Sequence, residues 1–129
     1  MILDSSAVIA VLLGEQGHER LVDRLADDPA PGIGAPTLAE TGVVLTAKLG
    51  IAGRTLLARF VEEAGVTVVP FADDHWPVAV DAFSRFGRGR HPAALNYGDC
   101  LTYAIARVAD ESLLCVGDDF ARTDLPMAV

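Results

Sequence analysis

The sequence predicts an α/β fold of three layers, α/β/α, with a short and mainly parallel central sheet. Short apolar segments bounded by Gly, Pro or acidic residues alternate with longer segments of helical periodicity. The short segments are apolar throughout, which is typical of strands that helices cover on both faces. With 129 residues, 51% hydrophobic and 22% charged, the chain can bury a substantial core. We therefore expect residues 1–129 to form a single domain.

The elements follow in order from these apolar runs and their breakers. Met1–Leu3 is expected to be a buried strand, and Ser5 or Ser6 to cap a helix that ends at Leu13, before Gly14. The spacing of apolar residues predicts further helices over Gly17–Ala26, Pro36–Leu49, Ile51–Ala64, Asp73 or Asp74 to Phe86, and Asn96–Ala109. Short apolar runs predict strands over Gly32–Ala35, Val66–Val69 and Leu113–Val116, and an edge strand over Leu125–Val129.

Acidic residues interrupt this apolar pattern at informative places. Asp4 directly follows the first predicted strand, and Asp118 and Asp119 follow the strand Leu113–Val116. Glu40 and Asp99 lie near the first turns of two apolar helices. Ligands of open parallel α/β sheets bind beyond the carboxyl ends of the strands. We therefore expect carboxylates from four separate segments to meet there.

A cluster of carboxylates needs compensation for its charge. Two unit charges about 5 Å apart repel by roughly 3 kcal/mol at an effective dielectric constant of 20. The chain has one lysine, Lys48, in the middle of a predicted helix, so no lysine is placed to compensate the cluster. A divalent ion that prefers oxygen ligands, Mg²⁺ or Mn²⁺, would compensate the charge of the cluster. Such ions catalyse the hydrolysis of phosphate esters. Each Asp alone is also a common cap or turn residue, so the joint pattern carries the prediction.

Four segments, in order along nearly the whole chain, carry a resemblance to a known family. They are Met1–Ala7 (MILDSSA), Pro36–Glu40 (PTLAE), His91–Leu101 (HPAALNYGDCL), and Leu114–Phe120 (LCVGDDF) with Thr123 and Asp124 after it. On these motifs the chain resembles the PIN-domain family, and within it the VapC-type ribonuclease toxins of bacterial toxin–antitoxin pairs. The third and fourth segments are the most specific part of this resemblance.

The resemblance implies a metal-dependent endoribonuclease in which Asp4 and Asp99 are the principal ligands and Glu40 is the third acid. The family pattern favours Asp119 as the fourth acid, and Asp118 is the second choice. Ser6 matches a hydroxyl residue that supports the metal site. Asn96 and Thr123 match positions that hold the acidic residues or the scissile phosphate.

The sequence also indicates where partners bind. Arg85, Arg88 and Arg90 form a basic patch just before the helix that bears Asp99, and we expect it to guide RNA to the acids. The stretches Leu12–Leu25 and Leu45–Val61 carry more apolar surface than a small core needs, which indicates a protein interface. The resemblance implies a homodimer, and an antitoxin that lays a helix in a groove and places a basic side chain at the acids.

The apolar runs and the net charge of the chain bear on its location and on how it could bind nucleic acid. No apolar run approaches the roughly 20 residues of a membrane span, and the N-terminus lacks the basic start of a signal peptide, so a cytoplasmic location is expected. The net charge of −8 excludes a generic, charge-driven nucleic-acid binder but not a metal-dependent nuclease. Trp76 is expected to pack at the start of its helix.

Three other functions compete with a nuclease. A haloacid-dehalogenase-like phosphatase needs a second Asp two residues after the first, where this chain has Ser6, and a lysine in another context than that of Lys48. A receiver-like signalling module needs a phosphorylatable Asp after its third strand, and Val68–Phe71 offers none. A catalytically inactive binding partner would have no need of the complete set of acids.

Overall fold

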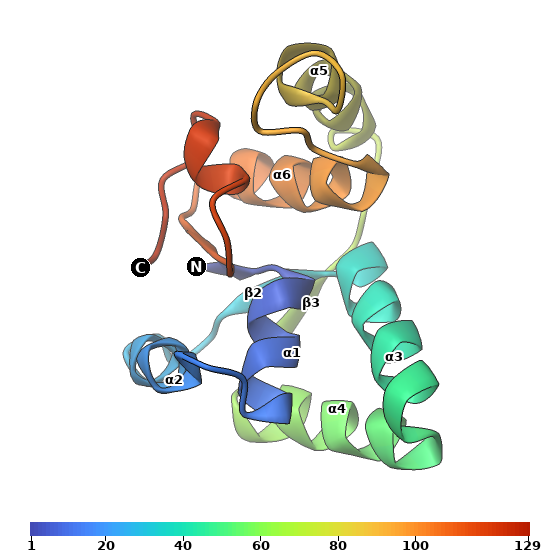
Figure 1. Ribbon diagram of the computed structural model, residues 1–129, viewed down its shortest axis with the longest axis vertical. Coiled ribbons are helices and arrows are strands. Elements are labelled where there is room, and N and C mark those ends of the chain that lie inside the picture. Colours follow the sequence, from blue (N-terminus) through green and yellow to red (C-terminus); the bar gives the residue numbers. More distant parts are fainter.

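A parallel sheet of four short strands forms the centre of the computed structural model, which describes residues 1–129 (Figure 1). The order across the sheet is β3-β2-β1-β4, and every neighbouring pair is parallel. The strands are β1 (Ile2–Leu3), β2 (Gly32–Gly34), β3 (Thr67–Val69) and β4 (Leu113–Leu114). Both central strands are buried on both faces, as their continuous apolar sequence predicts.

Six α-helices cover the two faces of the sheet. They are α1 (Ser5–Leu13), α2 (His18–Ala26), α3 (Ala35–Leu49), α4 (Ile51–Glu63), α5 (Trp76–Phe86) and α6 (Tyr97–Ala109), and a 3₁₀ turn, η1, spans Phe120–Arg122. In Figure 1, α5 and α6 lie on one side of the sheet, and α1 to α4 lie on the other. The predicted α/β/α fold is therefore confirmed.

The two faces of the sheet belong to two separate apolar clusters. Ile2 and Leu113 pack with residues of α5 and α6, whereas Leu3, Leu114 and Ile33 pack with residues of α1, α3 and α4. Successive side chains of a strand point to opposite faces, so two apolar residues in a row serve both clusters. This explains how strands of only two residues can tie three layers together.

Gly34 allows α6 to approach the sheet closely. A Cβ atom at this position would lie 2.7 Å from Cγ1 of Ile105, a residue of α6 with only 1% of its surface exposed. Any side chain at the end of β2 would therefore push α6 away. The end of β2 leads directly into α3, so this close approach also brings the first turns of α3 and α6 near each other.

Four local predictions are wrong. Asp4, not Ser5 or Ser6, caps α1, because its carboxylate accepts from the amide of Ser6. Helix α5 begins at Trp76 without a side-chain cap, so neither Asp73 nor Asp74 caps it. The edge strand over Leu125–Val129 reduces to a single bridge between Leu113 and Met127. Trp76 is 58% exposed and does not serve as a packing anchor.

No helix of this fold combines the length and the apolar character that crossing a membrane requires.

Candidate active site

The predicted acidic residues lie at one edge of the sheet, where the parallel strands end. Asp4 follows β1, and the loop with Asp118 and Asp119 follows the neighbouring strand β4. Glu40, in the second turn of α3, and Asp99, in the first turn of α6, come close to the same edge. A buried hydrogen bond of 2.9 Å links the hydroxyls of Thr37 on α3 and Thr102 on α6, three residues from Glu40 and Asp99 respectively.

Asp4 is the most deeply buried of these acids. Its residue surface is 5% exposed, and its Oδ2 accepts from the amide of Ser6 at 3.1 Å and from Oγ of Ser6 at 2.6 Å. Oγ of Ser6 in turn accepts from the amide of Val116 at 3.0 Å, which ties the loop after β4 to Asp4. Oδ1 of Asp4 makes no hydrogen bond, and since no buried polar side-chain atom lacks a partner, this oxygen reaches the surface.

Asp99 is held by a capping box at the start of α6. Its amide donates to Oδ1 of Asn96 at 2.8 Å, while its own Oδ2 accepts from the amide of Asn96 at 3.0 Å. This reciprocal pair of bonds fixes both the helix start and the carboxylate. Asn96 therefore supports Asp99 in this structure, and the second carboxylate oxygen of Asp99 remains available.

The charges of acids from four segments act on common neighbours. The pKa of Asp99 is raised above its usual 3.8, chiefly by burial and further by the charges of Asp4, Asp119 and Glu40, although the Asn96 amide acts in the opposite direction. The Cys115 thiol has a pKa raised to about 12 by burial and by Asp4, Asp119 and Asp99. Asp119, and not Asp118, is among the charges that raise these two pKa values, and which of the two is the fourth acid stays a prediction.

Glu40 lies against a residue that the sequence did not single out. Its exposed side chain lies against Gly98, where a Cβ atom would stand 2.8 Å from Oε2 of Glu40. Gly98 directly precedes Asp99 in the first turn of α6. A glycine beside a candidate ligand inside a helix is the one sequence signal that could have identified this contact.

The donor chemistry of the site fits a hard divalent cation. All the converging groups are carboxylates, and no thiolate or imidazole joins them. As the side chains stand, no three His, Cys, Asp or Glu residues form a group that could hold a metal ion. The acids thus lie within electrostatic reach of one another, and they would have to draw closer to share one ion. The raised pKa of Asp99 indicates that a cation would relieve the repulsion.

Two other predicted site residues are engaged elsewhere. Oγ1 of Thr123 donates to the carbonyl of Phe120 at 2.6 Å and accepts from the amide of Leu125, so it shapes the turn after η1 and makes no bond to the acids. Arg85 forms an ion pair with Asp124 at 3.1 Å, so the charge of Arg85 is partly compensated within the protein. The three predicted arginines therefore do not form one uniform patch.

Arg88 and Arg90 are exposed and form no ion pair. The guanidinium of Arg90 lies over the ring of Phe83, 5.4 Å from its centroid. Both side chains thus remain available to an anionic ligand, in contrast to Arg85.

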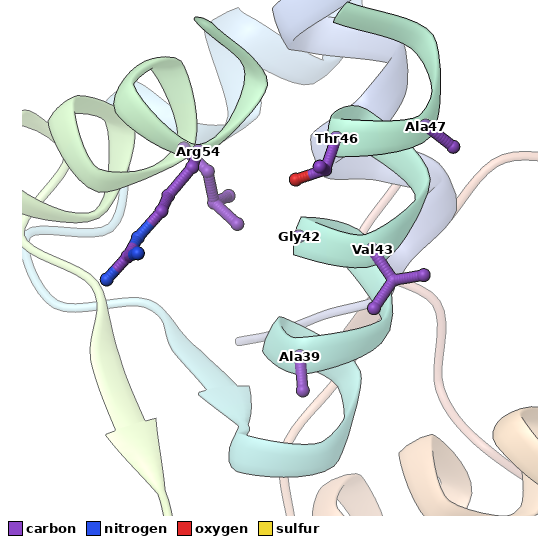
Figure 2. A pocket seen from close by; sticks show the side chains of 7 residues that line it. Ala39, Gly42, Val43, Thr46, Ala47 and Arg54 are labelled. Atoms are coloured by element: carbon purple, nitrogen blue, oxygen red, sulfur yellow. The ribbon is translucent and has the colours of Figure 1, made fainter. Parts of the chain in front are cut away.

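Three hollows lie near the acids, and one of about 370 Å³ between α3 and α6 is lined by Glu40 itself, together with Tyr97 and Gly98. Two more lie close by. The first, of about 520 Å³, lies between α3 and α4, and Figure 2 shows residues of α3 along one wall and Arg54 of α4 on the other. It begins at Ala39, the neighbour of Glu40, and Val43 beside it is 70% exposed. The second hollow lies between α5 and α6 and has an entirely apolar lining of Ala79, Val80, Phe83, Tyr97, Cys100 and Leu101.

Comparison with known proteins identifies a family. The PIN domain model matches residues 1–125. The chain is 48% identical over 126 residues to "Ribonuclease VapC36" of Mycobacterium tuberculosis, which covers 97% of this chain and 91% of the relative. It is 38% identical over 125 residues to "Ribonuclease VapC" of Mycolicibacterium smegmatis, with 97% of each chain covered.

Solved structures resemble the fold over nearly its whole length. The toxin VapC20 of Mycobacterium tuberculosis, described as cleaving the sarcin–ricin loop, superposes with a TM-score of 0.78 at 18% identity and covers 96% of this chain and 95% of its own. VapBC2 of Rickettsia felis, bound to a fragment of promoter DNA, gives 0.77 at 13% identity and covers 98% and 94%. At these identities the structures support the fold alone.

Proposed function

This chain belongs to the PIN-domain family, and on that premise we propose that it is a metal-dependent endoribonuclease that hydrolyses RNA phosphodiester bonds. One observation carries the proposal: carboxylates from four segments lie near one another, since the pKa of the half-buried Asp99, which burial chiefly raises, is raised further by the charges of Asp4, Asp119 and Glu40. The names of its relatives, which are ribonucleases, support the choice of RNA as substrate. Residues 1–129 would act as one nuclease domain in the cytoplasm.

The residues divide into ligands and supports. Asp4 and Asp99 would hold Mg²⁺ or Mn²⁺ through the oxygens that their hydrogen bonds leave free, with Glu40 and Asp119 beside them. Ser6 and Asn96 hold these two ligands in place. When bound, such an ion lowers the pKa of water and polarises the phosphoryl oxygen. Asp118 stays the second choice for the fourth acid, and Thr123, whose hydroxyl bonds within the turn after η1, would contact the RNA.

The RNA would approach past the loop between α5 and α6. Arg88 and Arg90 can contact phosphates there, whereas Arg85 serves mainly to hold Asp124. The acids themselves repel phosphate, so the arginines and the cation together would offset the net charge of −8 near the scissile bond.

We further propose that the protein is the toxin of a toxin–antitoxin pair. The groove between α3 and α4 ends at the residue next to Glu40 (Figure 2), so a helix bound there would bring a basic side chain to the acids. Two of the structures that share this fold carry the names of toxin–antitoxin proteins, VapBC2 and a complex of Klebsiella pneumoniae. Cleavage should therefore fall when the cognate antitoxin is added.

A homodimer would use the apolar surface over α5 and α6. Trp76, Val80, Phe83 and Tyr97 are between 42% and 79% exposed. The last three of them line the apolar hollow between these helices. The two stretches that the sequence indicated as an interface, Leu12–Leu25 and Leu45–Val61, belong partly to the core, since Leu21, Leu45 and Leu57 are buried. Light scattering on a Phe83→Glu variant should report monomers where the unmodified protein gives dimers.

Cleavage of a labelled RNA by the purified protein tests the central proposal. Activity should require Mg²⁺ or Mn²⁺, disappear with a chelator, and fall by at least a hundredfold in Asp4→Asn and Asp99→Asn, because each substitution removes a charged ligand and leaves the fold intact. Equal cleavage by the unmodified protein and both variants would point to a contaminating nuclease. No labelling by acetyl phosphate is expected, which separates this function from a receiver-like module or a phosphatase.

A further inference from the structure

Gly98 and Glu40 make a contact that only glycine permits. A Cβ atom on residue 98 would lie 2.8 Å from Oε2 of Glu40, 3.4 Å from its Cδ and 3.5 Å from Oδ1 of Asn96. The first distance is shorter than any real contact of a Cβ atom, and the other two are ordinary. The conflict is therefore confined to the terminal oxygen of one side chain.

The backbone at Gly98 does not itself require glycine. Its φ is not among the positive values of the chain, and it lies within the first turn of α6. At such a position glycine is a poorer helix former than alanine. The helix therefore gains nothing from glycine here, and the reason for it lies outside the helix, in the space that the Glu40 carboxylate occupies.

Little else holds Glu40 where it is. The residue is exposed, and its carboxylate takes part in no hydrogen bond and no ion pair. It nevertheless lies at the N-terminal end of α6, where the partial positive charge of the helix favours a carboxylate. Asp99, next to Gly98, experiences the charge of Glu40. The open surface of Gly98 thus lets Glu40 lie beside the start of α6 and close to Asp99.

We propose that Gly98 is a positioning residue for Glu40: the missing side chain lets the Glu40 carboxylate take its place at the cation site. The inference rests on the proposed function, since it concerns how the third acid reaches the metal. In Gly98→Ala the added methyl group would turn the flexible Glu40 side chain away, and the backbone would stay where it is. The loss should therefore appear in metal binding and leave the fold intact.

Titration of the metal-free protein with Mn²⁺ in a calorimeter tests this role. We expect Gly98→Ala to raise the Kd for Mn²⁺ about tenfold, the lower end of what displaced supporting groups cost metal sites. The melting temperature should stay unchanged or rise, because alanine is the better helix former. If Gly98 had a merely structural role, Gly98→Ala would instead lower both the melting temperature and the affinity for Mn²⁺.

The matched control is the same substitution in a Glu40→Ala background, where the clashing carboxylate is absent. There Gly98→Ala should change the Kd by less than twofold, because the pair would act through one contact. An equal effect in both backgrounds, or no effect in either, would overturn the proposal.

Crystal structures of the unmodified protein and of Gly98→Ala provide a second readout that needs no metal. The Glu40 carboxylate should lie against residue 98 in the first and be displaced in the second. An unmoved Glu40 would overturn the positioning role. Failure of the unmodified protein to bind Mn²⁺ would instead refute the proposed metal-dependent function, and the two crystal structures would still decide the position of Glu40.

Discussion

Ser6→Ala should destabilise both the fold and the site, although it removes a single oxygen atom. Oγ of Ser6 donates to the buried carboxylate of Asp4 at 2.6 Å and accepts from the amide of Val116 at 3.0 Å. The first is a charge-assisted bond, of a kind that contributes about 1.5–3 kcal/mol. Val116 is 51% exposed, so water can replace the second bond at little cost. We therefore expect a loss of about 2–3 kcal/mol in the free energy of unfolding.

Urea denaturation in the presence of a chelator measures this loss without interference from bound metal. For a chain of this length, each kcal/mol corresponds to about 3–5 °C in melting temperature, so a thermal scan should give a shift of about 6–15 °C. Mn²⁺ affinity should fall by about tenfold to a hundredfold, because Asp4 loses a group that orients it.

The adjacent Ser5 offers a matched control. It is the first residue of α1, lies half-buried like Ser6, and forms no side-chain hydrogen bond. Ser5→Ala should therefore leave stability within about 0.5 kcal/mol of the unmodified protein. If Ser6→Ala were no more destabilising than Ser5→Ala, the bridge from Asp4 to Val116 would be energetically irrelevant and the reasoning refuted.

Three further predictions concern charged and titrating groups. Burial raises the pKa of Asp99 above 3.8, so the ionised carboxylate destabilises the metal-free fold at neutral pH. Asp99→Asn should therefore resist urea better than the unmodified protein at pH 7 with chelator. This difference should vanish at a pH below the pKa that Asp99 has in the unfolded chain. An Arg88→Ala, Arg90→Ala double variant should bind RNA more weakly with a salt dependence smaller by about two charges, whereas Arg85→Ala should mainly reduce stability. An absorbance titration should find that burial and the hydrogen bond to Asp124 raise the pKa of Tyr103 to about 12.

Local sequence patterns predicted most of the secondary structure, because apolar periodicity and breakers act over a few residues. The helix boundaries agree within one to three residues, and the parallel sheet follows from strands that are apolar throughout. The errors fall where two local signals compete. Ser5, Ser6 and Asp4 can all cap a helix, and the structure uses Asp4, while Oγ of Ser6 accepts from the amide of Val116, 110 residues away.

Charge pairs were the least predictable part of the site. Arg85 looked like one member of a basic patch, yet it pairs with Asp124, 39 residues further along, which also accepts from the buried Tyr103 at 2.6 Å. No local pattern encodes such a partner. The prediction that Trp76 packs at the start of its helix was wrong for a similar reason. Whether a side chain is exposed depends on whether a distant part of the chain covers it.

The order of residues alone determined the alternation of strands and helices, because hydrophobic periodicity is a local property. It also placed acids at the ends of strands and near the first turns of helices, because chain direction is local as well. It also carried the motifs by which the family was identified, and the assignment of the individual acids to a metal remains a prediction. Only the tertiary structure decided that the charges of Asp4, Glu40 and Asp119 reach Asp99, and that Glu40 lies against Gly98. These outcomes depend on distances between side chains from separate segments, which packing of the three layers sets.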